Sequence, residues 1–332
     1  MRSKKIIETT TLGEGEYLEC VFDNYVEMAK YSVDWTIFCI YQFKPHSLHG
    51  ALSILELPNM QIARTDSVGS LMFDFVVPEN RINFGILDRV ADKACVDYMK
   101  LQSGMIGIFD DLKIYNYMHN DEMKIFDISL KESASPLLRD RLTRAVDKYY
   151  IDTDRKMARL MGNIIDFYAD KTPLSTEVSA QIEMQVTEAM LQLTAQQDAR
   201  EPQFTESETV ALAIRKQIFS HMDGNFTTAA LARQHGISER SLQNAFKSLF
   251  GFTPNHFIRL LKLNLIHHEL VQSDSSEQTV SRVAQKWGFK HLGRFSSYYA
   301  ELFGETPSDS LKRTNPMPSG MHIDCTERKE EI

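Results

Sequence analysis

The stretch WGFKHLGRFSSYYAELFGETPSD, residues 287–309, repeats a pattern that HGISERSLQNAFKSLFGFTPNHF carries at residues 235–257. When Leu242 is aligned with Phe295, further positions match in register: Phe246 with Tyr299, Phe250 with Phe303, Gly251 with Gly304, and Thr253-Pro254 with Thr306-Pro307. Two copies of one small helical unit indicate two equivalent contacts with a periodic partner. Duplex DNA is the obvious partner of this kind.

The first copy has the pattern of two helices joined by a short turn. Thr227 is a predicted N-cap of a short helix, and Ser238 is a predicted N-cap of a second helix that ends near Leu249. His235-Gly236 forms the turn between them. The apolar residues of this copy are expected to face inward: Ile237, Leu242, Ala245 and Phe246. The polar residues left on the outer face suit base edges and phosphates, although they could also form an ordinary solvated surface: Arg240, Gln243, Asn244 and Lys247.

The second copy repeats this layout. Thr279 is the predicted N-cap of its first helix, and the turn falls at residues 287–289. A second helix is expected from about Leu292 to Leu302, with Phe295 and Tyr299 inward. Its outer face offers fewer groups for reading bases: His291, Arg294, Ser296 and Ser297.

A long helix is predicted between the two copies. Pro254 suits its first position, and the helix should end near Val271. About 17 residues at 1.5 Å each make a rigid spacer of roughly 25 Å. With the ends of each unit added, the two outer helices would lie about 34 Å apart, which is one turn of DNA.

Residues 205–313 resemble the DNA-binding domain of the AraC/XylS family of bacterial transcription regulators. The resemblance rests on LARQHGISERSLQNAFKSLFGFTP and VAQKWGFKHLGRFSSYYAELFGETPSD, and it is similar to the branch with XylS and ethanolamine-utilisation regulators. It implies base reading by one set of residues from each copy: Arg240, Gln243 and Asn244, then His291, Arg294 and Ser297. Many relatives carry Arg at the position of Ser297, so the second helix is expected to contribute mainly phosphate contacts and DNA bending.

The N-terminal half is predicted to be rich in β-strands. Short runs of β-branched and aromatic residues, punctuated by turn residues, indicate a small sandwich or barrel, and the resemblance implies a cupin-like sensor barrel. The expected organisation is α+β in residues 1–196, which end in helices, a linker at 197–206, an all-α DNA-binding domain at 207–314 and a disordered tail at 315–332. Within that domain, two helix-turn-helix units are expected at 227–249 and 279–303, joined by the helix at 254–271. The linker ends in a predicted capping box, with Thr205 as N-cap and Glu208 three residues later.

A helical segment closes the N-terminal half. Its sequence STEVSAQIEMQVTEAMLQLTAQQ carries an apolar stripe that either packs on the chain's own strands or forms a dimer seam: Val178, Ile182, Val186, Ala189, Met190 and Leu193.

The charge of the chain is unevenly distributed. The whole chain carries a net charge of −8, but residues 205–315 hold 13 Lys and Arg against 10 Asp and Glu, about +3. An acidic body with a weakly basic C-terminal domain is the asymmetry expected when one domain meets phosphates. No run of eighteen apolar residues and no signal peptide are visible, so a cytoplasmic location without a membrane partner is expected.

The sensor barrel could hold a small molecule among aromatic side chains, although each of these could equally be an ordinary core residue: Trp35, Phe73, Phe75 and Phe84. The three histidines of this region, His46, His49 and His119, lack the spacing of a metal site, and the four cysteines form no CxxC pair. No metal, no cofactor and no catalytic residues are therefore predicted.

The leading hypothesis is a transcription regulator, more often an activator in this family, gated by an effector. Its expected partners are promoter DNA and RNA polymerase, with a small-molecule effector and a homodimer as further candidates. Two alternatives remain at this stage. One is a cupin-type metalloenzyme with a regulatory DNA-binding tail, and the other is a regulator controlled by protein partners without a small ligand.

Overall fold

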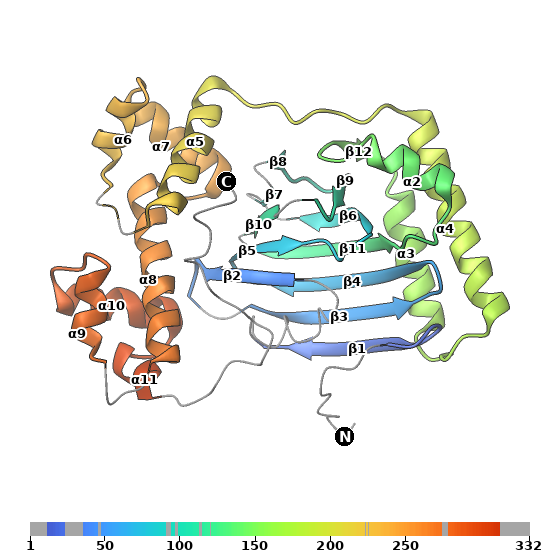
Figure 1. The fold of residues 1–332 in the computed structure, drawn as a ribbon, viewed down its shortest axis with the longest axis horizontal. Helices are drawn as coiled ribbons and strands as arrows, with labels where there is room; N and C mark the ends of the chain where they lie inside the picture. Colours follow the sequence, from blue (N-terminus) through green and yellow to red (C-terminus); the bar gives the residue numbers. More distant parts are fainter. Residues whose placement is uncertain are drawn as a thin grey trace.

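The computed structural model describes residues 12–23, 36–45, 48–90, 94–96, 99–112, 115–119, 121–222, 224, 226–273 and 278–312. A sheet-rich N-terminal part lies between helices α2 to α4 on one side and the C-terminal helices on the other (Figure 1). Trp35, His46 and the predicted tail at 315–332 lie outside the described residues.

The first sheet of the N-terminal part has seven antiparallel strands in the order β1-β3-β4-β11-β6-β9-β12. Their bounds are Tyr17–Phe22, His49–Glu56, Met60–Val68, Glu122–Leu130, Ile82–Val90, Met105–Asp110 and Tyr149–Ile151. The second sheet has five strands in the order β2-β5-β10-β7-β8. Their bounds are Thr36–Gln42, Leu71–Val76, Tyr115–His119, Cys95–Val96 and Met99–Lys100.

Alternation along each strand gives the seven-stranded sheet two different faces. On β4, Met60 and Ile62 pack on the helices, whereas Gln61, Ala63 and Thr65 face the space between the sheets. The described strands thus form two sheets rather than one closed barrel, which corrects the expectation of closure. The edge strand β12 joins this sheet because Tyr149, Tyr150 and Ile151 pair with β9.

Three helices cover the outer face of the seven-stranded sheet: α2 (Pro136–Thr143), α3 (Lys156–Tyr168) and α4 (Thr176–Gln196). The predicted stripe of α4 packs on the chain's own core, with Ile182, Val186 and Met190 fully buried. Packing rather than a dimer seam therefore explains this stripe. From α4 the chain crosses to the C-terminal helices as an extended segment (Figure 1).

The C-terminal part is entirely helical in its described residues: α5 (Glu206–Ser220), α6 (Thr228–Gln234), α7 (Glu239–Phe250), α8 (Pro254–Gln272), α9 (Val280–Lys286), α10 (Leu292–Phe303) and α11 (Pro307–Lys312). The capping box predicted at the start of α5 is confirmed, because the Thr205 hydroxyl accepts from the Glu208 N–H and the Glu208 carboxylate accepts from the Thr205 N–H. Helix α11 was not anticipated from the sequence.

Candidate functional site

Helices α6 and α7 form the first helix pair. Thr227 caps α6 by accepting from the Ala230 N–H at 3.2 Å, and Ser238 caps α7 by accepting from the Ser241 N–H at 3.0 Å. Gly236 makes the turn between them with φ of +69°, a left-handed conformation that favours glycine. Space is not the constraint at this glycine, because an added Cβ would meet nothing within 4 Å.

Helices α9 and α10 form the second helix pair, and its backbone copies the first. Thr279 caps α9 by accepting from the Arg282 N–H at 3.3 Å, and Gly288 makes the turn with φ of +88°. The residue after each turn glycine closes the same hydrogen bond: the Ile237 N–H donates to the Ala232 carbonyl at 3.0 Å, and the Phe289 N–H donates to the Ala284 carbonyl at 2.9 Å. The sequence repeat is therefore a structural repeat. One difference is that His291 at the N-cap of α10 makes no side-chain capping bond.

Helix α8 holds both pairs. The first pair contacts its start, where the Thr228 N–H donates to Asn255 Oδ1 at 3.2 Å. The second pair contacts its end, where Trp287 Nε1 donates to Glu269 Oε2 at 2.8 Å. Helix α8 has 19 residues, so it spans about 28 Å.

The predicted DNA-reading side chains lie on the outer faces of α7 and α10. On α7, Leu242, Ala245 and Phe246 are buried in the core as expected. The predicted residues of α7 are exposed or half-buried: Arg240, Gln243, Asn244 and Lys247. The predicted residues of the second pair are exposed: His291, Arg294 and Ser297. The Ser297 hydroxyl donates to the Gly293 carbonyl at 3.1 Å, so its hydrogen is already used within α10.

Comparison with known proteins supports this reading of the helix pairs. A family model described as a helix-turn-helix domain matches residues 231–313. The probable thc operon regulatory protein of Rhodococcus erythropolis is 36% identical over 93 residues, which are 28% of this chain and 28% of that protein. The XylDLEGF operon transcriptional activator of Pseudomonas putida is 36% identical over 96 residues, which are 29% of this chain and 30% of that protein.

Residues 231–313 form a helix-turn-helix domain of the AraC type. The match spans less than a third of the length of these two relatives. Among solved structures, the AraC-like transcriptional activator CuxR aligns over 76% of this chain and 96% of its own, with 13% identity and a TM-score of 0.42.

A cavity of about 420 Å³ lies between the two sheets, away from the AraC-type domain. Its volume falls within the range of small-molecule sites, roughly 300–1000 Å³. Phe73 and Phe75, two of the aromatic residues proposed for a ligand site, line it, and an aromatic group forms around them with Tyr117 and Phe109. Phe84 does not line it, because β6 alternation directs this ring to the opposite face, where it packs against helices.

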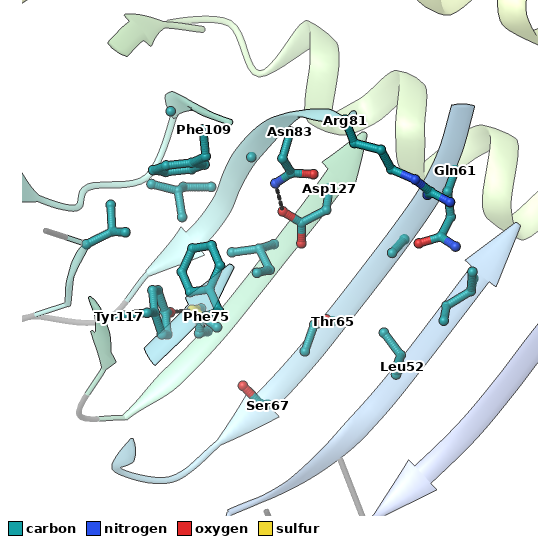
Figure 2. Close-up of a pocket in the computed structure, with 18 of the residues that line it drawn as sticks. Leu52, Gln61, Thr65, Ser67, Phe75, Arg81, Asn83, Phe109, Tyr117 and Asp127 are labelled. Carbon is teal, nitrogen blue, oxygen red and sulfur yellow. Dashed lines mark hydrogen bonds between the residues drawn. The ribbon is translucent and has the colours of Figure 1, made fainter. Parts of the chain in front are cut away.

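The cavity also has polar groups that sequence reasoning missed (Figure 2). At one end, the Lys131 ammonium lies 2.6 Å from Glu56 Oε1, and Gln61 Nε2 donates to Glu56 Oε2 at 2.8 Å. In the middle, Asn83 Nδ2 donates to Asp127 Oδ1 at 2.9 Å. Alternation of polar and apolar residues on β6 and β11 was the available signal, but it could not say which face enclosed a cavity.

The histidines of this part are not gathered at one point. His49 is exposed at the start of β3, whereas His119 is buried in the cavity wall, where burial lowers its pKa to about 4. Across the described residues, no group of three His, Cys, Asp or Glu side chains is placed to hold a metal ion. Within the same residues, no helix has both the length and the apolar character needed to cross a bilayer.

The sheet-rich part and the AraC-type domain share one apolar core. Residues of the five-stranded sheet and the loop after β2 join the core of the C-terminal helices: Tyr41, Phe43, Met72, Cys95 and Met118. The Phe43 ring lies 5.6 Å from the ring of Phe252 and 5.6 Å from that of Phe257. Lys100 on β8 bonds both Glu208 and Ser248, which ties the sheet to α5 and to the end of α7.

Proposed function

We propose that this chain is a sequence-specific DNA-binding transcription regulator. The observation that supports it most is the repeated helix pair of the AraC-type domain, whose outer helices both carry exposed polar and cationic side chains. Each pair acts as one helix-turn-helix unit, with α7 and α10 as its reading helices. Arg240, Gln243 and Asn244 read bases from α7, and Lys247 contacts phosphate.

The two units contact successive major-groove segments on one face of the duplex. Helix α8 supports this arrangement, because a rod of about 28 Å, extended by the ends of each unit, approaches the ~34 Å repeat of B-DNA. In the second unit, His291, Arg294 and Ser297 supply fewer base contacts. The second unit contributes mainly phosphate contacts and bending of the DNA.

The sheet-rich part serves as a cupin-like sensor whose cavity receives an effector. The cavity's size and aromatic wall support this role, and the shared core offers a direct route to the reading helices. An effector that binds two arrangements of the sheets unequally would shift how the helices are held. At a promoter, the chain acts as an activator through RNA polymerase.

Selection of duplexes from a randomised 30-base-pair pool tests the DNA-binding function. The full chain should enrich two sequence blocks about 10 base pairs apart, and fluorescence anisotropy should show affinity that falls steeply with KCl. The double variant Arg240→Ala/Arg294→Ala, folded as judged by circular dichroism, is the control and should enrich these blocks much less than the wild type. A wild-type chain that enriches no sequence would contradict the proposal.

A further inference from the structure

Asn83 and Asp127 form a polar spot in the middle of an otherwise largely apolar cavity wall (Figure 2). They lie on neighbouring strands, and on one side of Asp127 the next two strands have glycine at the paired position, since Asp127 pairs with Gly85 and Gly85 pairs with Gly107. A Cβ added at Gly85 would lie 3.3 Å from the Phe109 ring and 3.5 Å from Asp127 Oδ1. Because Gly85 has no side chain, the space between the Asp127 carboxylate and the Phe109 ring is not filled from this position.

The hydrogen-bonding capacity of this spot is not used up. Asn83 is 2% exposed, its Nδ2 donates to Asp127, and its Oδ1 is buried with no hydrogen-bond partner among the described residues. Nor does any Lys, Arg or His in the described part of the chain form an ion pair with Asp127. Burial raises the pKa of Asp127 to about 6, so at pH 7.5 most of the population carries a charge, and among the described residues Asn83 alone is seen to stabilise it by a side-chain hydrogen bond. Two adjacent acceptors in an enclosed, apolar place call for a donor with a positive charge.

The other charged groups of the cavity are at a different place. Glu56 is occupied by Lys131 and Gln61, and Arg81 extends toward Gln61 at that same end (Figure 2). Aromatic rings lie on the other side of Asp127, with the Phe75 and Phe109 centroids 6.1 Å apart. A bound cation at Asp127 would thus have ring faces within reach, which favours an ammonium group further.

We propose that the cavity binds a small amine with an apolar ring, its ammonium group held by Asn83 Oδ1 and the Asp127 carboxylate. This inference rests on the proposed role of the sheet-rich part as an effector sensor and names the chemical class of the effector. The ring packs among Phe75, Phe109 and Tyr117. A matching alcohol offers one donor and no charge, and a matching carboxylic acid brings a like charge toward Asp127, so both bind more weakly.

Thermal unfolding and isothermal titration calorimetry of the full chain at pH 7.5 test this class. The probes are benzylamine, phenethylamine and 4-phenylbutylamine, each with the alcohol and the carboxylate of the same skeleton. At least one amine should raise the unfolding midpoint and bind roughly tenfold or more tightly than its alcohol and its carboxylate, because hydrogen bonds to charged groups are the stronger ones. The proposal is overturned if all three amines leave the midpoint unchanged at 5 mM, roughly the weak end of ligand affinities, or if an alcohol or carboxylate binds as tightly as its amine.

Asp127→Asn separates this role from a structural one. The variant keeps the shape of the site and a group that can pair with Asn83, but it loses the charge, so amine affinity should fall about tenfold or more while alcohol affinity changes little. Asp154→Asn is the matched control, because Asp154 is exposed and does not line the cavity. Equal amine affinity in the wild type and Asp127→Asn would also overturn the proposal. DNA selection is measured on the same preparations without any probe, so failure of the amine leaves that result standing by itself.

Discussion

Gln42 and Asn264 are joined by two reciprocal hydrogen bonds, although 222 positions separate them along the chain. The Gln42 N–H donates to Asn264 Oδ1 at 2.7 Å, and Asn264 Nδ2 donates to the Gln42 carbonyl at 2.8 Å. The Gln42 side chain adds a third contact, from Nε2 to the Leu302 carbonyl at 2.7 Å. The end of β2 thereby bonds the helix that carries both pairs and the end of α10. The Asn264 side chain on α8 thus bonds the backbone at the end of β2 through both a donor and an acceptor, as a neighbouring strand would.

Replacing this amide should destabilise the whole chain. Asn264 is 3% exposed, and Asn264→Leu would leave the Gln42 N–H and carbonyl without partners beside a buried apolar side chain. The expected loss is about 1–3 kcal/mol in the free energy of unfolding, measured by urea denaturation. Gln192→Leu, an exposed amide on α4, is the control and should change stability by less than about 0.5 kcal/mol. Equal effects of the two substitutions would mean that the reciprocal pair contributes nothing.

Arg240→Ala should weaken DNA binding and relax sequence preference at one base pair. Arg240 is exposed on the first turn of α7, where an arginine side chain can reach a guanine edge. The expected cost is about 1–3 kcal/mol, or roughly tenfold to a hundredfold in Kd, measured by anisotropy on the selected duplex and its point variants. Arg159→Ala removes an exposed arginine from α3 and should leave both quantities unchanged. Wild-type affinity with an unchanged preference would exclude Arg240 from base reading.

Ser297→Arg should strengthen DNA binding. Ser297 is exposed on α10, and its hydroxyl is bonded back to the Gly293 carbonyl, so the present side chain offers the groove little. An arginine there adds a cation, and the slope of log K against log salt should steepen by about one. Thr153→Arg adds the same charge to an exposed position of the sheet-rich part and should not change the slope. An unchanged slope in Ser297→Arg would mean that this face of α10 does not approach phosphate.

The sequence predicted best those features that local chemistry decides. Thr205, Thr227, Ser238 and Thr279 all cap the helices expected of them, because a capping hydroxyl oxygen and the N–H that donates to it lie within three residues. The turn at Gly236 could also be predicted from local sequence, since the left-handed backbone conformation is a property of one residue. Apolar periodicity likewise located the buried faces of α7 and α10.

Features decided by distant partners could not be predicted in this way. Phe75 and Phe84 are both aromatic residues in β-strands, yet of these two Phe75 alone lines the cavity. The way the two sheets pack decides which of the two alternating sets of side chains on a strand faces the cavity. The Gln42–Asn264 pair joins two parts that the sequence presents as separate domains. Asp127 lies within a run that matches an ordinary half-buried strand, so its enclosure became visible only with the second sheet in place.

Asp127→Asn should make the ligand-free chain more stable at neutral pH. Burial raises the pKa of Asp127 from 3.8 to about 6, despite the hydrogen bond from Asn83, which lowers it. A carboxyl group whose folded pKa lies above its unfolded value binds protons more tightly in the folded state. Its contribution to stability is therefore complete below about pH 4 and is lost as the pH rises through about 6.

Asp127→Asn removes the charge, so it should recover the stability that the wild type loses when Asp127 ionises. The gain at pH 7.5 should reach up to about 3 kcal/mol in the free energy of unfolding, and it should shrink toward zero at pH 4. Urea denaturation at pH 4.5, 6.0 and 7.5 measures this difference, and Asp154→Asn should show no such trend because its carboxylate is exposed. A variant that is less stable than the wild type at pH 7.5 would show that the folded state gains from this charge without a ligand. A gain that grows between about pH 4 and pH 6 and levels off above pH 6 would instead mean that the chain keeps a destabilising carboxylate in its cavity, as expected of a group retained for binding a cation.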